Sequence, residues 1–488
     1  MNSTRRITSP FKSLISRVLR IVPLAAIVVA VSYYAARQIS SPSQRMIKMG
    51  VLGGMLVFMF RFDMIYSVLA FTLLFPFPSG ITIGSTNSIM MTLVTMAWAI
   101  RAASTGQRLT QPTRYDRAFA LLVLAYVMSF YNCEDNEQIF LGLHVLWRQL
   151  AAVMYFYAVL MFVNDEKRLV RFTKVAGVML GVVVFTGIVE LFAPGSTLVP
   201  GWLSLPKVRG VGSFTYRIEG VRLGGVVGGH NILGDMASLS LFIMVFHALR
   251  SRNPLERFLW AVGALSSITV LLGTANRGAF LSLALALVYA LFWFRSRVSF
   301  ARIVVVCAAV IAVFAITQVI LDEYTLAISM TDRLLGTKMQ GLTPDTRVGV
   351  WKPAFMKSFE HPFFGHGPHY DTGFGLTFQY WPHNGYIFYF YTIGLVGVGA
   401  FLWVCTLLLK RSLTFRRPGV RGTRLGDLAT IFHIQLVMLM IGQLRTDHQR
   451  DEVHIYVIYL VFAMVATTAE IIDRGERAPG ASVRAGPL

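Results

Sequence analysis

Charge is scarce in this sequence, and negative charge is the scarcest. Only 14% of the 488 residues are charged, with 24 Asp and Glu against 45 Lys and Arg, while 55% are hydrophobic and the mean hydropathy is +0.59. A soluble domain carries about 25% charged residues, so this composition excludes a soluble protein. Apolar runs of about twenty residues recur along the chain and predict an all-α polytopic membrane protein.

Cysteines are few, and a leader cleavage site is missing. The three cysteines, Cys133, Cys307 and Cys405, are widely spaced and match neither a metal-ligand set nor a thioredoxin-like motif, so we assign them no role. The basic segment 1–20 precedes an apolar run without a small-residue cleavage site. This pattern predicts a cytoplasmic basic tail and a retained first helix rather than a signal peptide.

The net charge of +21 is the one feature that would suggest a nucleic-acid partner. The basic residues, however, form short clusters between the apolar runs, which is the distribution that the positive-inside rule produces. We therefore expect no nucleic acid, and the clusters serve to orient the chain in the membrane.

The apolar runs predict roughly 12–14 transmembrane helices. The second and third runs are short, so they form either two spans or a tilted or re-entrant pair. The expected spans are 19–37, 47–60, 63–80, 86–100, 117–131, 139–163, 169–193, 230–249, 256–274, 278–296, 300–320, 384–409, 428–444 and 453–473.

Loop charge predicts the orientation of these helices. Basic loops at 101–117, 250–257 and 410–427 alternate with an acidic turn at 133–137 and a long loop at 321–383. The basic loops are therefore expected in the cytoplasm and the long loop outside. The expected organisation is a tail at 1–20, N-terminal transmembrane helices at 21–193, a catalytic core at 194–409 with external loops 194–229 and 321–383, C-terminal transmembrane helices at 410–473 and a disordered cytoplasmic tail at 474–488.

The long loop is the main functional candidate. Loops of this length are usually functional or disordered, and its Trp, Tyr, Phe and His content argues against disorder. We expect a partly helical active-site loop, with Arg347 and Trp351 on a short helix. A simple ion pair of Arg347 with Asp345 or Asp332 is the alternative for that arginine.

Four cations in the external loop 194–229 break the positive-inside rule. An anionic ligand would explain them, and backbone amides of the glycine-rich stretch 224–229 would assist, because a helix begins near His230. Contact with anionic lipid headgroups is the alternative. The cations are Lys207, Arg209, Arg217 and Arg222.

Arg277 and His383 are expected at the external ends of membrane helices. An arginine at that depth costs a few kcal/mol unless it pairs or reaches water, and its guanidinium suits bidentate phosphate contacts. A neutral histidine is a natural general base near pH 7. The alternatives are a snorkelling arginine and an interfacial histidine between Trp381 and Tyr386. A zinc site is disfavoured by its ligand spacing; it would combine His383 with His361, His366 and His369.

Other polar residues lie inside the expected spans. His144 and Arg148 are one helical turn apart, and we expect internal pairing for most residues of this kind. They leave open a proton-coupled transporter, whose sites lie near the midplane on broken helices. The isolated residues are Glu190, Asp235, His247 and His433.

Residues 180–410 contain short motifs in a specific order. The most specific is His383-Asn384-x-Tyr386 followed by Gly394-x-x-Gly397. The others are Arg222-Leu223-Gly224-Gly225 with Asn231, Arg277-x-x-x-Leu281, Arg347 with Trp351, and His361-Pro362 with Gly365-x-Gly367. In these motifs the chain resembles the O-antigen ligase and Wzy-type polymerase superfamily of GT-C-type membrane glycosyltransferases. It departs at Gly229-His230-Asn231, where relatives often carry Pro-Asn.

The resemblance implies an inverting glycosyltransferase in the bacterial inner membrane, with a periplasmic active site and no metal ion or cofactor. The donor would be an undecaprenyl-pyrophosphate-linked oligosaccharide, and the acceptor a sugar hydroxyl on another glycan or on lipid A core. Arg222, Arg277 and Arg347 would hold the pyrophosphate, and His383 would take the acceptor proton. Membrane lipids, a flippase and a chain-length regulator are the other implied partners. From the loop charge and the resemblance together, the expected substrate-binding residues are Arg209, Arg217, Arg222, Trp351, Tyr370, Trp381, Asn384 and Tyr386.

The acceptor distinguishes a polymerase from a ligase. Lipid A core is strongly anionic and favours surplus cations, whereas loop 321–382 has five Lys and Arg against six Asp and Glu. Its aromatic side chains suit a neutral glycan, so we expect a repeat-unit polymerase, with an O-antigen ligase as the alternative. These aromatics are Phe363, Phe364, Tyr370, Phe374, Phe378, Tyr380 and Trp381.

Overall fold

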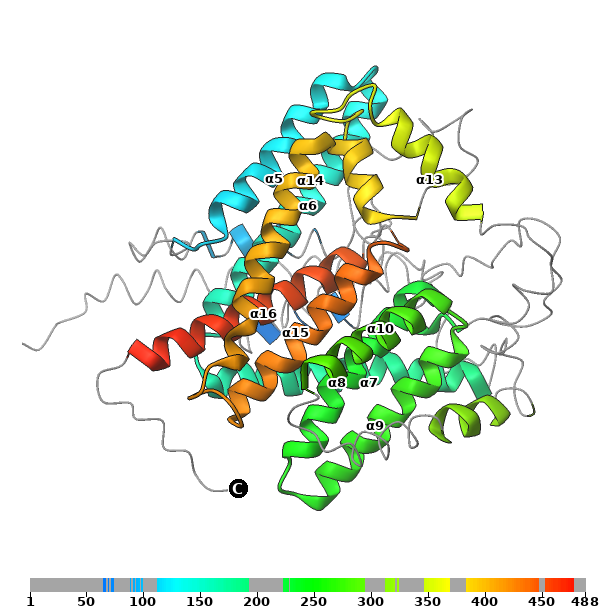
Figure 1. Ribbon diagram of the computed structural model, residues 1–488, viewed down its shortest axis with the longest axis vertical. Helices are drawn as coiled ribbons and strands as arrows, with labels where there is room; N and C mark the ends of the chain where they lie inside the picture. Colours follow the sequence, from blue (N-terminus) through cyan, green and yellow to red (C-terminus); the bar gives the residue numbers. More distant parts are fainter. Residues whose placement is uncertain are drawn as a thin grey trace, which may run out of the picture. The chain divides into compact units, whose positions relative to one another are not determined.

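The computed structural model describes residues 112–192, 223–227, 229–294, 312–320, 346–368, 383–446 and 453–477, with single residues at positions 65–99 and at 323. Within these residues the regular structure is entirely helical, without a strand, which confirms the all-α fold. The chain divides into two compact units, Met1–Ser67 and Val68–Leu488. All the labelled helices of Figure 1 belong to the second unit.

Seven helices of the described residues are long and apolar enough to cross a membrane, so the protein is a polytopic membrane protein. They are α6 (Asn136–Phe162), α7 (Glu166–Phe192), α8 (His230–Arg250), α9 (Pro254–Gly273), α14 (Gly385–Ser412), α15 (Arg424–Gly442) and α16 (His454–Arg477). Shorter helices are α5 (Asp116–Ser129), α10 (Arg277–Phe294) and α13 (Thr346–Lys357).

The helix positions agree with the hydropathy pattern. Every expected span from 117–131 to 278–296, and each of the last three, lies within four residues of a helix in the structure. The spans 19–37 and 47–60 lie outside the described residues. The same holds for most of 63–80 and 300–320 and for about half of 86–100, so the total of 12–14 stays a prediction.

Polar capping residues begin several helices where the hydropathy rises. The Asp135 side chain accepts a hydrogen bond from the Gln138 amide at 2.7 Å and starts α6. Asn253 caps α9, which has Pro254 in its first turn, and Thr423 caps α15. Such caps satisfy amides that have no partner inside the helix, and this explains why each helix begins where it does.

The helices pack around α16. In the most apolar stretch of α16, 94% of the residues are buried by the rest of the protein, against 33% in α9. In Figure 1 the green helices α8, α9 and α10 form one group, and the amber α14 runs beside α5. The surface of α9 is apolar, as expected for a helix that faces lipid; its exposed side chains include Leu255, Phe258, Leu259, Val262 and Leu265.

The basic loops meet at one end of the bundle, here called the basic end. Arg250, at the end of α8, donates from Nε to the Asp427 carboxylate at 2.6 Å. Asp473 accepts from Arg411 at 2.6 Å and from Arg417 at 2.9 Å, and Arg114 lies 3.7 Å away. The described parts of the three basic loops, which were predicted to lie on one side of the membrane, therefore lie at one end of the structure.

Helix α14 is broken at Gly394, where φ is +66° and ψ is −169°. The break frees backbone groups, and the loop segment 361–367 satisfies them. Its hydrogen bonds are Leu395 N to Pro362 O at 2.8 Å, Val396 N to Phe363 O at 3.3 Å, His366 N to Tyr391 O at 2.8 Å and Gly367 N to Thr392 O at 3.2 Å. The C-terminal part of the long loop is thus anchored to the helix that follows it.

Glycine is required on both sides of this contact. Gly365 and Gly394 both have positive φ, and a Cβ atom on either would overlap backbone atoms of the opposite segment. A side chain there would be strained by conformation and by lack of space. Gly365 and Gly394, one from each of the two glycine motifs, therefore have a structural role at this contact.

Gly394→Ala is expected to destabilise the protein by at least about 2 kcal/mol, because positive φ and backbone overlap each carry a cost. Gly399→Ala is the matched control in the same helix, since a Cβ there meets nothing within 4 Å. Thermal unfolding in detergent should show a lower midpoint for Gly394→Ala only. Equal midpoints for the two variants would contradict the close backbone approach.

Candidate active site

The start of α14 is tied to the end of α15. Asn384 caps α14, because its Oδ1 accepts from the amides of Tyr386 at 3.0 Å and Ile387 at 3.1 Å. Its Nδ2 donates to the Leu444 carbonyl at 3.2 Å, and the Gly385 amide donates to the Gln443 carbonyl at 2.7 Å. The Tyr386 hydroxyl donates to the Met440 carbonyl at 3.0 Å. Asn384 and Tyr386, expected to bind substrate, thus have clear structural contacts.

His383 directly precedes this cap. It is partly exposed and has a φ of +46°, a left-handed conformation that is uncommon for a non-glycine residue. A residue held in such a conformation needs support from its surroundings, which here come from the capped turn that follows. The structure therefore places the predicted base at the mouth of the helix, where the hydropathy pattern placed it.

The start of α10 is a tight turn after α9. Asn276 caps α10, since its Oδ1 accepts from the Ala279 amide at 3.2 Å, and its Nδ2 donates to the Asn231 carbonyl of α8 at 3.5 Å. Ala275 has a φ of +47° and is fully buried. Arg277 is the first residue of α10 and is partly exposed, as expected for an arginine at a helix mouth.

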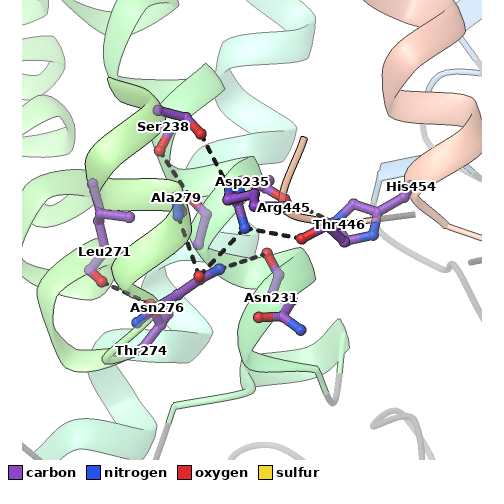
Figure 2. Close-up of polar contacts among 12 residues, drawn as sticks. Asn231, Asp235, Ser238, Leu271, Thr274, Asn276, Ala279, Arg445, Thr446 and His454 are labelled. Carbon is purple, nitrogen blue, oxygen red and sulfur yellow. Dashed lines mark hydrogen bonds and ion pairs between the residues drawn. The ribbon is translucent and has the colours of Figure 1, made fainter. Parts of the chain in front are cut away.

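Arg445 and the residues just before it join these two helix starts, and Figure 2 shows the contacts of Arg445 with Asn276 and Asp235. Its Nη1 donates to Asn276 Oδ1 at 3.4 Å, and its Nε donates to Ser282 Oγ at 3.1 Å. The residue before it, Leu444, accepts the hydrogen bond from Asn384. The structure thus brings the turns that carry Arg277 and His383 to the same end of the bundle, here called the site end.

Asp235 and His454 complete this cluster. Asp235, on the first turns of α8, forms an ion pair with Arg445, and His454 Nε2 lies 3.1 Å from its other oxygen. Both Asp235 and His454 are buried. Internal pairing of Asp235 is therefore confirmed. Arg445 and His454 are site residues that were not predicted from the sequence, although Arg445, like Arg277, is an arginine at the end of an apolar segment.

The glycine-rich stretch before α8 binds a carboxylate of the protein itself. The amides of Gly224 and Gly225 donate to Glu190 Oε2 at 2.9 Å and 2.6 Å, and the Leu223 amide donates to the Gly273 carbonyl at 3.3 Å. The expectation that these two amides face an anionic ligand is therefore wrong. A buried carboxylate at the end of α7 needs donors, and these amides supply them.

The long loop is partly helical, as expected. Helix α13 packs on α14, with the rings of Phe355 and Phe359 at 5.6 Å and 5.2 Å from that of Phe390. Trp351 is partly exposed on α13, and Arg347 lies in its first turn. Several site predictions lie outside the described residues: the side chain of Arg347, and Arg209, Arg217, Arg222, Tyr370 and Trp381.

The loop histidines have aromatic neighbours. His366 stacks on Tyr391 with ring centroids 4.4 Å apart, and His361 lies edge-on at 4.7 Å. Burial lowers the pKa of His366 below its ordinary value of 6.5. The stability that goes with the neutral imidazole is therefore fully present above pH 6.5, and it is lost as the pH falls through the lowered pKa. In the described part of the chain no group of three His, Cys, Asp or Glu residues could hold a metal ion; His369 lies outside that part.

The remaining intramembrane polar residues have partners within the protein. His433 lies 2.7 Å from Ser412 Oγ and 2.8 Å from the Tyr289 hydroxyl. His247 stacks on Trp260 with centroids 4.8 Å apart, and His144 contacts Phe140 at 4.7 Å. The polar contacts of His433 are the internal pairing that was expected, whereas the contacts given for His247 and His144 are with aromatic rings.

The residues that match a known family include part of the site end. Residues 236–402 match a family model described as O-antigen ligase. The matched range contains Arg277, Arg347 and His383, and it ends before Arg445. No curated protein matches the chain. Residues 236–402 are therefore similar to the O-antigen ligase family, which confirms the resemblance seen in the motifs of this part of the chain.

Proposed function

We propose that the protein is a metal-independent glycosyltransferase that moves a lipid-linked glycan onto a sugar hydroxyl. The observation that carries this proposal is the convergence of the Arg277 and His383 turns on the segment 443–445. Such a site offers a cation and a base at one membrane surface. Both are needed when the donor is a glycan linked to a lipid through pyrophosphate.

The chemistry is a single displacement. His383 takes the proton of the acceptor hydroxyl as its oxygen attacks the anomeric carbon of the donor. The bond between that carbon and the pyrophosphate oxygen breaks, and undecaprenyl pyrophosphate leaves with the electron pair. Arg277, with Arg347 and Arg222, stabilises the negative charge on the leaving group. Attack from the opposite side inverts the anomeric carbon, and Trp351, Tyr370 and Trp381 stack on the sugars.

The site end faces the periplasm in this proposal. Arg114, Arg250, Arg411 and Arg417 gather at the basic end, and basic loops favour the cytoplasm. The opposite end then lies at the outer surface of a bacterial inner membrane, where a flippase delivers the donor. A lipid tail in the bilayer and a glycan in water meet at this boundary.

A repeat-unit polymerase is the finer proposal. The long loop has five Lys and Arg against six Asp and Glu over 321–382, which suits a neutral glycan acceptor better than a phosphorylated lipid A core. An O-antigen ligase is the second candidate, favoured by the description of the matched family.

Deletion of the gene is expected to remove high-molecular-weight polymer while single repeat units still reach their final acceptor. This result follows if the enzyme lengthens the glycan rather than attaching it. Electrophoresis of envelope polysaccharide measures it, and the wild-type gene on a plasmid is the control. Full-length polymer on undecaprenyl pyrophosphate beside a bare lipid A core would identify a ligase instead.

Purified protein in lipid vesicles is expected to turn over an undecaprenyl-pyrophosphate oligosaccharide, and EDTA should leave the rate unchanged. Released undecaprenyl pyrophosphate and lengthened glycan are the readouts. Strong inhibition by EDTA that zinc reverses would indicate a histidine metal site. Solute transport along an ion gradient by a His383 variant would favour a transporter.

A further inference from the structure

Arg445 is enclosed, and the protein itself uses its donors. The side chain is 13% exposed. Its Nε donates to Ser282 at 3.1 Å, its Nη1 donates to Thr446 at 3.1 Å and to Asn276 at 3.4 Å, and its Nη2 donates to Asp235. A guanidinium that already makes these hydrogen bonds is poorly placed to bind a phosphate as well. Its contacts indicate a role in arranging other groups (Figure 2).

The guanidinium reaches the residue that starts α10. Asn276 Oδ1 accepts both from Arg445 and from the Ala279 amide, so the cap and the guanidinium share one oxygen. The Arg445 side chain also lies against Gly278, where a Cβ atom would collide with it. Arg277 lies between Asn276 and Gly278, so Arg445 contacts the residues on both sides of it.

The backbone next to Arg445 holds the start of α14. The carbonyl of Gln443 accepts from the Gly385 amide at 2.7 Å, and that of Leu444 accepts from Asn384 at 3.2 Å. His383 is the residue before that cap. The segment 443–445 therefore contacts the turns of both predicted catalytic residues, one through backbone carbonyls and the other through a side chain.

Asp235 pairs with the guanidinium, and His454 lies beside the other oxygen of this carboxylate. A buried ion pair adds little net stability, because the desolvation of two charges offsets most of their attraction. Stability alone is therefore a weak explanation for an Arg–Asp pair in an apolar bundle. Asp235 does bring α8 and α16 to the same point as Arg445, since His454 begins α16 and lies 3.1 Å from Asp235.

We propose that Arg445 is a positioning residue, which sets the placement of Arg277 relative to His383 by bridging the first turns of α10 and α14. The catalytic part of this inference rests on the proposed function. A lysine at 445 keeps the positive charge but cannot reach Asp235, Asn276 and Ser282 together, because it lacks the planar fork. The two turns then lose their common support, and small displacements of reacting groups lower rates strongly.

Arg445→Lys is expected to lower kcat by at least about tenfold while KM stays within about threefold. Arg250→Lys is the matched control, because Arg250 also pairs with an aspartate, Asp427, but at the basic end. Both of its constants should stay within about threefold of the wild type. Asn276→Ala breaks the same bridge, so the double variant Asn276→Ala with Arg445→Lys should be no slower than the slower single variant. The inference is overturned if the double variant shows the product of the two single losses in kcat. It is also overturned if kcat for Arg445→Lys is within about threefold of the wild type.

A second measurement needs no turnover and separates this inference from the proposed function. Spin labels at Leu281, exposed on α10, and Ile387, partly exposed on α14, report the separation of the two first turns in a chain whose three cysteines are replaced by alanine. Arg445→Lys should broaden or shift the distance distribution, and Arg250→Lys should leave it unchanged. An unchanged distribution in Arg445→Lys overturns the bridge. A wild type that is inactive on the lipid-linked donor contradicts the proposed function alone.

Discussion

His383→Asn is expected to reduce glycan transfer about 1,000-fold while the protein stays folded. A positioned general base contributes about 10²–10⁴-fold, and asparagine cannot accept the proton. Asparagine is chosen because residue 383 has a φ of +46°, a conformation that asparagine tolerates better than most residues. His383→Ala should be equally inactive, with some added loss of stability. The measurement is the rate of undecaprenyl pyrophosphate release per folded enzyme.

His144→Ala is the control for this prediction. His144 lies within α6, where its ring contacts Phe140, and it belongs to the pair that a transporter would use. A glycosyltransferase should retain its rate within about threefold in this variant. Normal polymer from His383→Asn at normal expression would show that His383 is not the base. Loss of function in His144→Ala alone would favour the transporter.

Arg277→Lys and Arg347→Lys are each expected to lower kcat about 100-fold or more, although both keep the charge. A guanidinium holds two oxygens of a pyrophosphate at once, whereas an ammonium is a single compact charge. The loss of one preorganised donor to a developing oxyanion costs about 10²–10³-fold. The measurement is kcat on the lipid-linked donor with purified enzyme in vesicles.

Arg250→Lys serves as the control here too, because it changes an arginine of the basic end, on α8, in the same way. The folded fraction of each variant is checked by thermal unfolding in detergent. Full activity in Arg277→Lys and Arg347→Lys would leave these arginines a general electrostatic role only. A large loss in only one of the two variants would identify that arginine as the one that contacts the pyrophosphate.

The sequence by itself determined the class of the protein and the positions of its membrane helices. Apolar runs of membrane length are local properties, so hydropathy located helices α5 to α10 and α14 to α16 within four residues. The motifs around Arg277 and His383 are also local, and residues 236–402 match the family they indicated. The loop charges placed Arg250 and Arg411 on one side, where the structure has both.

Only the tertiary structure decided which polar groups meet. Glu190 binds the amides of Gly224 and Gly225, and Arg445 binds Asp235. These partners are far apart in sequence, and their pairing depends on how the helices pack, which no local periodicity encodes. The close contact between the loop segment 361–367 and the break at Gly394 has the same origin, since its glycines are needed only once two distant backbones touch.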